Sequence, residues 1–237
     1  MDVSKEIIFY TDNRIENPIR DLAREYISAS GLSIISSSLK PIPFGDNVVT
    51  KGKRGYLTMV TQILSCLERS TADYVFFCEH DVLYPKSHFD FTPTNDEIFY
   101  YNSNIWRWKY PGGKAITYDR LLSLSCMCAN RELALAHYAM RQEKIEEWGL
   151  EKFKSREPRR ARVWGYEPGT KKRKRGGLTD DDFETWSSEI PIVDIRHGKT
   201  FSSPKCSLDD FKHLPTNFRD IPIEEIPGWD LKGLFHL

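Results

Sequence analysis

Short apolar runs alternate with helical periodicity over the first part of the chain. Residues 6–11 form a β-branched and aromatic run that ends at Asp12-Asn13, which indicates a buried strand followed by a polar loop. Apolar positions recur at helical spacing between residues 17 and 30, and residues 32–36 return to a strand pattern. The order strand, helix, strand predicts a βαβ unit at the start of the fold.

A second helix and a central strand follow this unit. Residues 55–69 place their apolar side chains on one helical face, so they predict an amphipathic helix. Residues 72–78 are a mainly apolar run, which is typical of a parallel strand covered on both faces. This strand leads into Glu79-His80-Asp81. Because open α/β sheets bind ligands beyond the carboxyl ends of their strands, we expect chemistry at this tripeptide.

The second half of the chain has a weaker pattern. It predicts strands at 97–102, 121–128 and 190–195, a helix over 130–148 with Asn130 as its cap, a long basic loop over 152–179, and an irregular tail after Pro204. Residues 104–110 form an aromatic and basic cluster that either lines an acceptor pocket or packs in the core.

These elements predict one α/β domain with a mostly parallel central sheet flanked by helices. Within it we expect one half over 1–100, a second half over 101–200 with a basic loop at 152–177, and an irregular C-terminal tail over 201–237.

Composition narrows the class of protein. The 237 residues are 40% hydrophobic and 13% aromatic, which suffices for a core and excludes disordered, collagen-like and coiled-coil chains. No apolar stretch is long enough to span a membrane, and the N-terminus lacks a signal-peptide layout. We therefore expect a soluble, cytoplasmic monomer without a membrane partner, whose five cysteines are reduced and mostly buried.

The charge is balanced overall but not locally. The net charge is zero, yet residues 152–175 contain eleven Lys or Arg against two Glu. A basic block interleaved with Trp164 and Tyr166 favours an anionic partner, and nucleic acid is the candidate. A flexible charged loop is the alternative. The candidate phosphate contacts are Arg159, Arg160, Arg162, Lys171, Lys172, Arg173, Lys174 and Arg175.

The tripeptide after the apolar strand carries the candidate metal chemistry. A local turn would let Asp81, with Glu79 nearby, face one cation, and Mg²⁺ and Mn²⁺ commonly bridge carboxylates to substrate phosphates. The alternative is a strand that simply ends in solvated acids.

The βαβ start with Tyr10-Thr11-Asp12, followed by the run 72–85 containing Glu79-His80-Asp81, resembles the GT-A class of nucleotide-sugar glycosyltransferases. In that class a D-x-D or E-x-D motif binds a divalent metal, Mn²⁺ or Mg²⁺, that holds the pyrophosphate of the donor. Glu79 and Asp81 match the motif, with Glu in place of the first Asp. The resemblance covers residues 6–200, and only the central motif is specific.

The resemblance implies that residues 1–100 are the nucleotide-sugar-binding half and residues 101–200 the acceptor-binding half. It also implies roles for further residues. A late histidine, His197, would complete the metal shell, and Lys199 would contact the diphosphate of a donor that is expected to be a UDP-sugar. The nucleoside would meet Thr11, Asp12 and Arg14. An acidic turn just before a helix would supply the base of inverting members, with Asp181 and Asp182 as candidates. Ordinary structural roles compete: a hydrogen-bonded histidine, a polar turn and a helix N-terminus.

Three functions remain open on the sequence. The first is a metal-dependent glycosyltransferase acting on DNA, because the chain is similar to the bacteriophage and base-J enzymes that glycosylate hydroxymethylated pyrimidines. The second is a transferase for cell-surface saccharide. The third is a non-catalytic nucleic-acid-binding module with the same fold.

Overall fold

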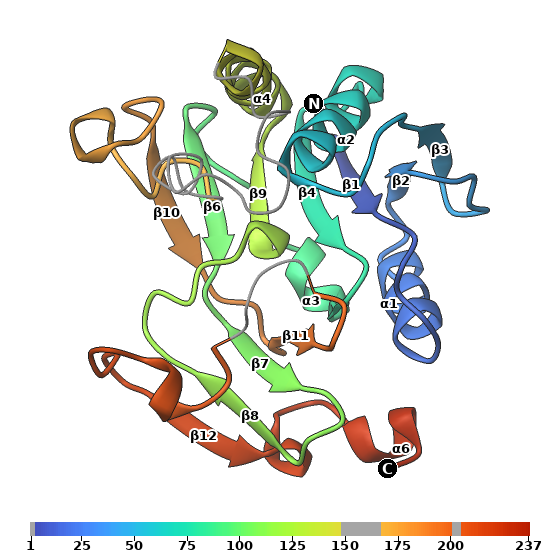
Figure 1. Cartoon of the computed structure of the whole chain (residues 1–237), viewed down its shortest axis with the longest axis vertical. Helices are drawn as coiled ribbons and strands as arrows, with labels where there is room; N and C mark the ends of the chain where they lie inside the picture. Colours follow the sequence, from blue (N-terminus) through green and yellow to red (C-terminus); the bar gives the residue numbers. More distant parts are fainter. Residues whose placement is uncertain (1–2, 148–166, 201–204) are drawn as a thin grey trace.

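Two β-sheets and the helices around them form the structure, a computed structural model that describes residues 3–147, 167–200 and 205–237 (Figure 1). Within these residues the larger sheet has the strand order β10-β6-β9-β4-β1-β2-β3 and the smaller one the order β12-β8-β7-β11-β5. The larger sheet comprises β1 (Lys5–Thr11), β2 (Ser33–Ser38), β3 (Asp46–Val49), β4 (Tyr74–Glu79), β6 (Ile98–Asn102), β9 (Met127–Asn130) and β10 (Asp182–Trp186). The smaller sheet comprises β5 (Val82–Leu83), β7 (Ile105–Lys109), β8 (Lys114–Thr117), β11 (Ile192–Arg196) and β12 (Arg219–Pro222).

Helices cover both faces of the larger sheet. They are α1 (Ile19–Ser28), α2 (Tyr56–Arg69), α3 (Lys86–Phe89) and α4 (Arg131–Glu147). The short helix α6 (Leu231–Phe235) packs in the core of the smaller sheet instead. The described residues also contain 3₁₀ turns at Leu124–Cys126, Arg173–Arg175, Leu208–Asp210 and Ile223–Glu225. The expected Asn cap is confirmed, since Oδ1 of Asn130 accepts hydrogen bonds from the amides of Glu132 and Leu133 at the start of α4. Across the described ranges no helix is long and apolar enough to span a bilayer.

Successive side chains along β1 point to opposite faces of the larger sheet, and each face has its own hydrophobic core. Ile8 and Tyr10 of β1 pack on the side of α2 and α4, whereas Ile7 and Phe9 pack on the opposite side with α1 and α3. β1 pairs in parallel with both β2 and β4, and β4 pairs antiparallel with β9. The predicted α/β class with a mostly parallel central sheet and helices on both faces is therefore confirmed.

The smaller sheet was not predicted as a unit. The cluster at 104–110 contains β7, whose neighbours are β11 in parallel and β8 antiparallel. Trp106 and Trp108 are buried in a core of their own with residues of α6. The aromatic alternation that we interpreted as a pocket or packing cluster is thus the inward face of a strand.

Two predicted elements are wrong. Residues 121–128 are not one strand, because a 3₁₀ turn at Leu124–Cys126 precedes β9. The acidic turn at 180–182 leads into β10 rather than a helix, and β10 pairs in parallel with β6. Phe183, Thr185 and Trp186 are residue types that favour strands, and this outweighs the helix-start signal of the acids. The tail after Pro204 contains short elements, β12 and α6, as well as irregular chain.

The cysteines agree with expectation. All five are free, four of them are buried, and Cys206 is half-buried.

Candidate functional site

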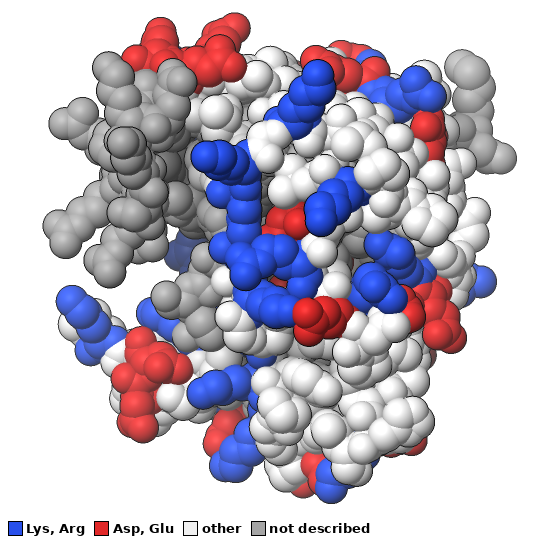
Figure 2. Space-filling view, turned by 45° about the vertical axis from the view of Figure 1, so that its right-hand side comes forward, with Lys and Arg blue, Asp and Glu red and all other residues white. Residues whose placement is uncertain are grey.

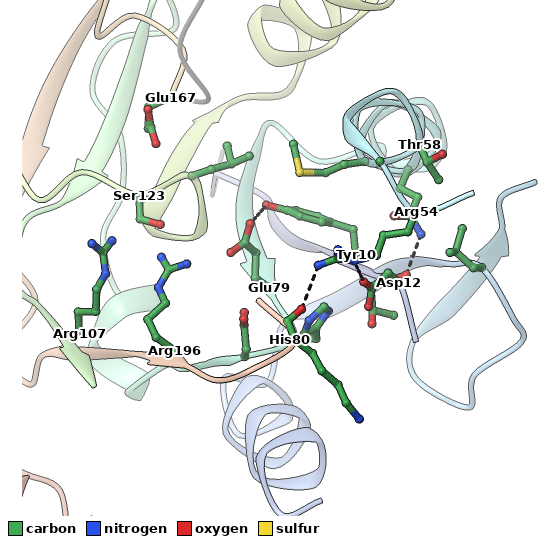
Figure 3. A pocket seen from close by; sticks show the side chains of 18 of the residues that line it. Tyr10, Asp12, Arg54, Thr58, Glu79, His80, Arg107, Ser123, Glu167 and Arg196 are labelled. Atoms are coloured by element: carbon green, nitrogen blue, oxygen red, sulfur yellow. Dashed lines mark hydrogen bonds and ion pairs between the residues drawn. The ribbon is translucent and has the colours of Figure 1, made fainter. Parts of the chain in front are cut away.

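A cavity of about 200 Å³ opens where β1 and β4 end, between the two sheets (Figure 3). Tyr10, Thr11 and Asp12 enter it from the end of β1, and Glu79, His80 and Asp81 enter it from the end of β4. The chain runs parallel in these two strands, so their carboxyl ends meet at one edge of the sheet. The site therefore lies where the sequence predicted chemistry.

A tight turn between β4 and β5 presents His80 and Asp81. β5 pairs antiparallel with β11, and the backbone amide of Ile195 donates a 2.9 Å hydrogen bond to the carbonyl of Asp81. This bond holds the end of β11 beside the turn, so that His197 reaches Asp81. Nε2 of His197 lies 3.3 Å from Oδ2 of Asp81.

Three side chains at this turn form a candidate metal centre. One ligand atom each from His80, Asp81 and His197 lies within 4.8 Å of the others. Nδ1 of His80 is buried and has no hydrogen-bond partner among the residues that the structure describes. A buried imidazole nitrogen without a partner costs stability unless a ligand satisfies it, so the residues fit a bound divalent cation. Two imidazoles and one carboxylate suit Mn²⁺ or a later transition metal better than Mg²⁺.

Glu79 has a different environment from the metal ligand that we expected. Its Oε1 accepts a 2.8 Å hydrogen bond from the hydroxyl of Tyr10, the residue opposite it in the β1–β4 register. Desolvation, together with the charge of Asp81, raises the pKa of Glu79 to about 8. Burial also works to raise the pKa of Asp81, but His80, His197 and Arg196 outweigh it and keep that pKa below its usual range. A metal-binding role for Glu79 stays a prediction.

The nucleoside candidates divide into two groups. Thr11 and Asp12 line the cavity, and Oδ1 of Asp12 accepts a 3.0 Å hydrogen bond from the amide of Arg14. Oδ2 of Asp12 pairs with Nε of Arg54 at 2.6 Å. The side chain of Arg14 is exposed and is not among the residues that line the cavity.

Two basic side chains frame this half of the cavity. Nη2 of Arg54 donates to the carbonyl of Lys199 at 2.9 Å, and Lys199 also lines the cavity. Nζ of Lys199 forms an ion pair with Glu16. The backbone amide of Lys199 contacts Nδ1 of His197 at 3.2 Å, so one short segment orients the histidine and supplies a cation. Figure 2 shows Lys and Arg side chains gathered around a recess with acidic side chains in it.

The other half of the cavity carries two arginines and a carboxylate. Arg107 of β7 and Arg196 of β11 lie side by side and point toward Ser123 and Glu167 (Figure 3). Nε of Arg107 is 3.0 Å from Oδ2 of Asp194, and Nη2 of Arg196 is 2.6 Å from the same oxygen.

Glu167 is held in place through its neighbours. The hydroxyl of Tyr101 donates a 2.6 Å hydrogen bond to the carbonyl of Pro168, and the hydroxyl of Thr170 donates to the carbonyl of Glu167. Burial raises the pKa of Glu167.

The predicted bases lie elsewhere. Asp182 is exposed and pairs with Lys172, with 2.9 Å between Oδ2 and Nζ. Asp181 accepts a hydrogen bond from Thr179, and its Oδ2 lies 3.6 Å from Nδ1 of the buried His137. Neither Asp181 nor Asp182 is among the residues that line the cavity. A catalytic role for either one stays a prediction.

The basic block is only partly described. Arg159, Arg160 and Arg162 lie outside the described residues. Lys171, Arg173, Lys174 and Arg175 are exposed, and Lys172 is half-buried. Gly176 closes their turn with φ of 91°, in the left-handed region that favours glycine. Contact of these side chains with nucleic acid stays a prediction.

Sequence reasoning missed four residues of the site. His80 was interpreted only as the middle residue of the E-x-D motif. Its imidazole, a common metal ligand, and its position in the expected turn could have identified it. Arg196 directly precedes His197, so its place at the end of the last predicted strand could have marked it in the same way. Arg107 was noted only as part of the aromatic and basic cluster at 104–110, and Glu167 lies in the basic block. No local signal singled out either residue.

No protein-family model and no curated protein sequence matches the chain. Solved structures give remote likenesses. One is a glycosyltransferase involved in glycosylation of the major capsid of PBCV-1, at TM-score 0.44 and 8% identity, covering 81% of this chain and 93% of that one. Another is the apo form of the glycosyltransferase GlyE of Streptococcus pneumoniae TIGR4, at TM-score 0.37 and 12% identity, covering 66% of this chain and 41% of that one. Both neighbours are glycosyltransferases, but similarity at these TM-scores carries no argument about this chain.

Proposed function

We propose that the protein is a metal-dependent glycosyltransferase that moves a sugar from a nucleotide sugar, with UDP as the expected nucleotide, to a hydroxyl acceptor. The observation that carries the proposal is the cluster of His80, Asp81 and His197 at the carboxyl edge of β4. Beside it lie the side chains of the β1 end and two cations, Arg54 and Lys199, in one cavity.

The proposal assigns the side chains of the cavity to binding the metal, the diphosphate and the nucleoside. His80, Asp81 and His197 would hold a divalent cation, which neutralises the diphosphate when bound and makes it a better leaving group. Lys199 and Arg54 would add donors to the phosphate oxygens. Thr11 and Asp12 would hydrogen-bond the nucleoside.

A carboxylate must accept the proton of the acceptor hydroxyl if the transfer inverts the anomeric centre. Glu167 lines the cavity, and its raised pKa keeps it closer to the range in which a base exchanges protons at neutral pH. We therefore assign this role to Glu167 and retain Asp181 and Asp182 as the alternatives predicted from the sequence.

For the acceptor we propose the hydroxymethyl group of a modified pyrimidine in DNA. The support is the basic run Lys171–Arg175, in which every side chain but that of Lys172 is exposed, since cationic side chains suit phosphate contacts. A saccharide acceptor is the alternative.

The test is the release of UDP from nucleotide sugars in Mn²⁺, with chelator as a blank. We expect metal-dependent turnover that Asp81→Ala abolishes while far-ultraviolet circular dichroism is unchanged. Asp209→Ala, a substitution of an exposed acid away from the cavity, is the matched control and should turn over like the unmodified protein. Equal turnover in chelator and in Mn²⁺ would refute the metal-dependent mechanism.

A further inference from the structure

We propose that the donor is a nucleotide sugar whose sugar carries a carboxylate, a uronic acid, and that Arg107 binds that carboxylate. The inference rests on the proposed function and names the substrate class of the same cavity.

The first step is the order of groups along the cavity. In Figure 3, Asp12, Arg54 and Thr58 lie on one side of Glu79, and Arg107 and Arg196 lie on the other. A nucleotide sugar has the linear order nucleoside, diphosphate, sugar. With the nucleoside at the end of β1 and the diphosphate at the metal cluster, the sugar comes to lie at the arginines.

The second step is the local charge. Arg107 and Arg196 both pair with Asp194, which is 1% exposed, and each arginine side chain is 11% exposed. Arg196 also faces the charges of Asp81 and Glu79. Within the described residues the ion pairing of Arg107 is limited to Asp194, so Arg107 is the arginine whose charge suits a ligand anion.

The third step is the hydrogen-bonding capacity of Arg107. Its Nε donates a hydrogen bond to Oδ2 of Asp194. Its Nη1 makes only long contacts, of 3.5 Å each, with the hydroxyl of Tyr118 and the carbonyl of Lys205. Its Nη2 donates no hydrogen bond to any residue that the structure describes, and Glu167, which lines the same end, forms no ion pair with it. A planar guanidinium with spare donors matches a carboxylate in charge and in geometry.

The fourth step is a variant that should keep its fold. In Arg107→Gln, Asp194 retains its ion pair with Arg196, so no buried carboxylate is left without a cation. Lys109→Gln is the matched control, because Lys109 lies on the same strand, is exposed and does not line the cavity. Thermal melts of both variants check the fold.

The experiment is calorimetric titration of the full chain, in MnCl₂, with UDP-glucose and with UDP-glucuronate. We expect the unmodified protein to bind UDP-glucuronate more tightly. The ratio of the two affinities should fall roughly 10- to 100-fold in Arg107→Gln, as for loss of a hydrogen bond to a charged group, and should persist in Lys109→Gln.

Each other outcome overturns the inference. Binding of UDP-glucose with equal or higher affinity than UDP-glucuronate refutes it and leaves the proposed function in place. An unchanged ratio in Arg107→Gln refutes the assignment of Arg107. Binding of neither nucleotide sugar refutes both proposals. If methyl glucuronide binds the UDP-saturated protein in an Arg107-dependent way while the donors show no preference, the carboxylate belongs to the acceptor and the donor assignment is wrong.

Discussion

His88 makes folding stability depend on pH in a way that can be worked out from its surroundings. It lies fully buried on α3, stacked on Trp186 with 5.5 Å between ring centroids, and its Nδ1 is 3.1 Å from Nδ2 of Asn102. Burial lowers its pKa to about 3, from an ordinary value of 6.5. The folded protein therefore holds His88 neutral, whereas the unfolded chain takes up a proton below about pH 6.5.

The sign of the effect follows from proton binding. Between about pH 6.5 and about pH 3 the unfolded state binds one more proton at this site, so the free energy of unfolding falls as the pH falls. At about pH 4.5 the unfolded histidine is about two pH units below its pKa, and the loss from His88 amounts to about 3 kcal/mol relative to about pH 7.5. His137, whose pKa is lowered by burial to about 4, contributes a similar loss.

The variant His88→Leu isolates this contribution. Its baseline stability at neutral pH will differ from that of the unmodified protein, because packing changes and Asn102 loses a contact. Only the difference between pH values is diagnostic. Between about pH 7.5 and about pH 4.5, the free energy of unfolding measured in urea should fall by about 3 kcal/mol less in the variant than in the unmodified protein. His213→Leu, at an exposed position, is the control. If the variant and the unmodified protein lose the same stability, His88 is not held neutral and the reasoning fails.

Two further predictions concern the base and the acceptor. Glu167→Gln should lower sugar transfer by roughly 100- to 10,000-fold, as for loss of a general base, while Asp181→Asn lowers it far less; the reverse order in a transfer assay would return the role to Asp181. Replacing all five residues of Lys171–Arg175 by Gln should flatten the slope of log DNA affinity against log salt by roughly 2 to 4, at about 0.9 per phosphate contact, with UDP release preserved. The same number of Gln replacements at the exposed Lys86, Lys109, Lys114, Lys212 and Lys232 is the control, and equal slopes in the two variants would remove the support for DNA.

The first half of the fold was predictable because each of its elements is locally consistent. The hydrophobic period along β1, α1, α2 and β4 matches the structure that each of them adopts, whereas the short strands β3 and β5 were not predicted. The place of the site followed from the same reasoning, since Asp81 stands at the end of an apolar strand.

The second half depends on pairing between distant segments, which the sequence pattern does not encode. β10 starts with acids that favour a helix N-terminus, but pairing with β6 decides its conformation. β7 and β11 come together from positions nearly ninety residues apart, so that Arg107 and Arg196 meet on Asp194. The place of His80 in the candidate metal cluster has a local cause, the turn between β4 and β5. The hydrophobic period of the sequence does not specify the geometry of that turn.

The measurement that tests the central claim most directly is a calorimetric titration of Mn²⁺ into the unmodified protein and into His80→Ala, with His213→Ala as the control at an exposed position. The proposed site predicts one Mn²⁺ per chain, an affinity roughly 10- to 100-fold weaker in His80→Ala, and no change in His213→Ala. The same Mn²⁺ affinity in the unmodified protein and in folded His80→Ala would contradict the metal site on which the proposed glycosyltransferase rests.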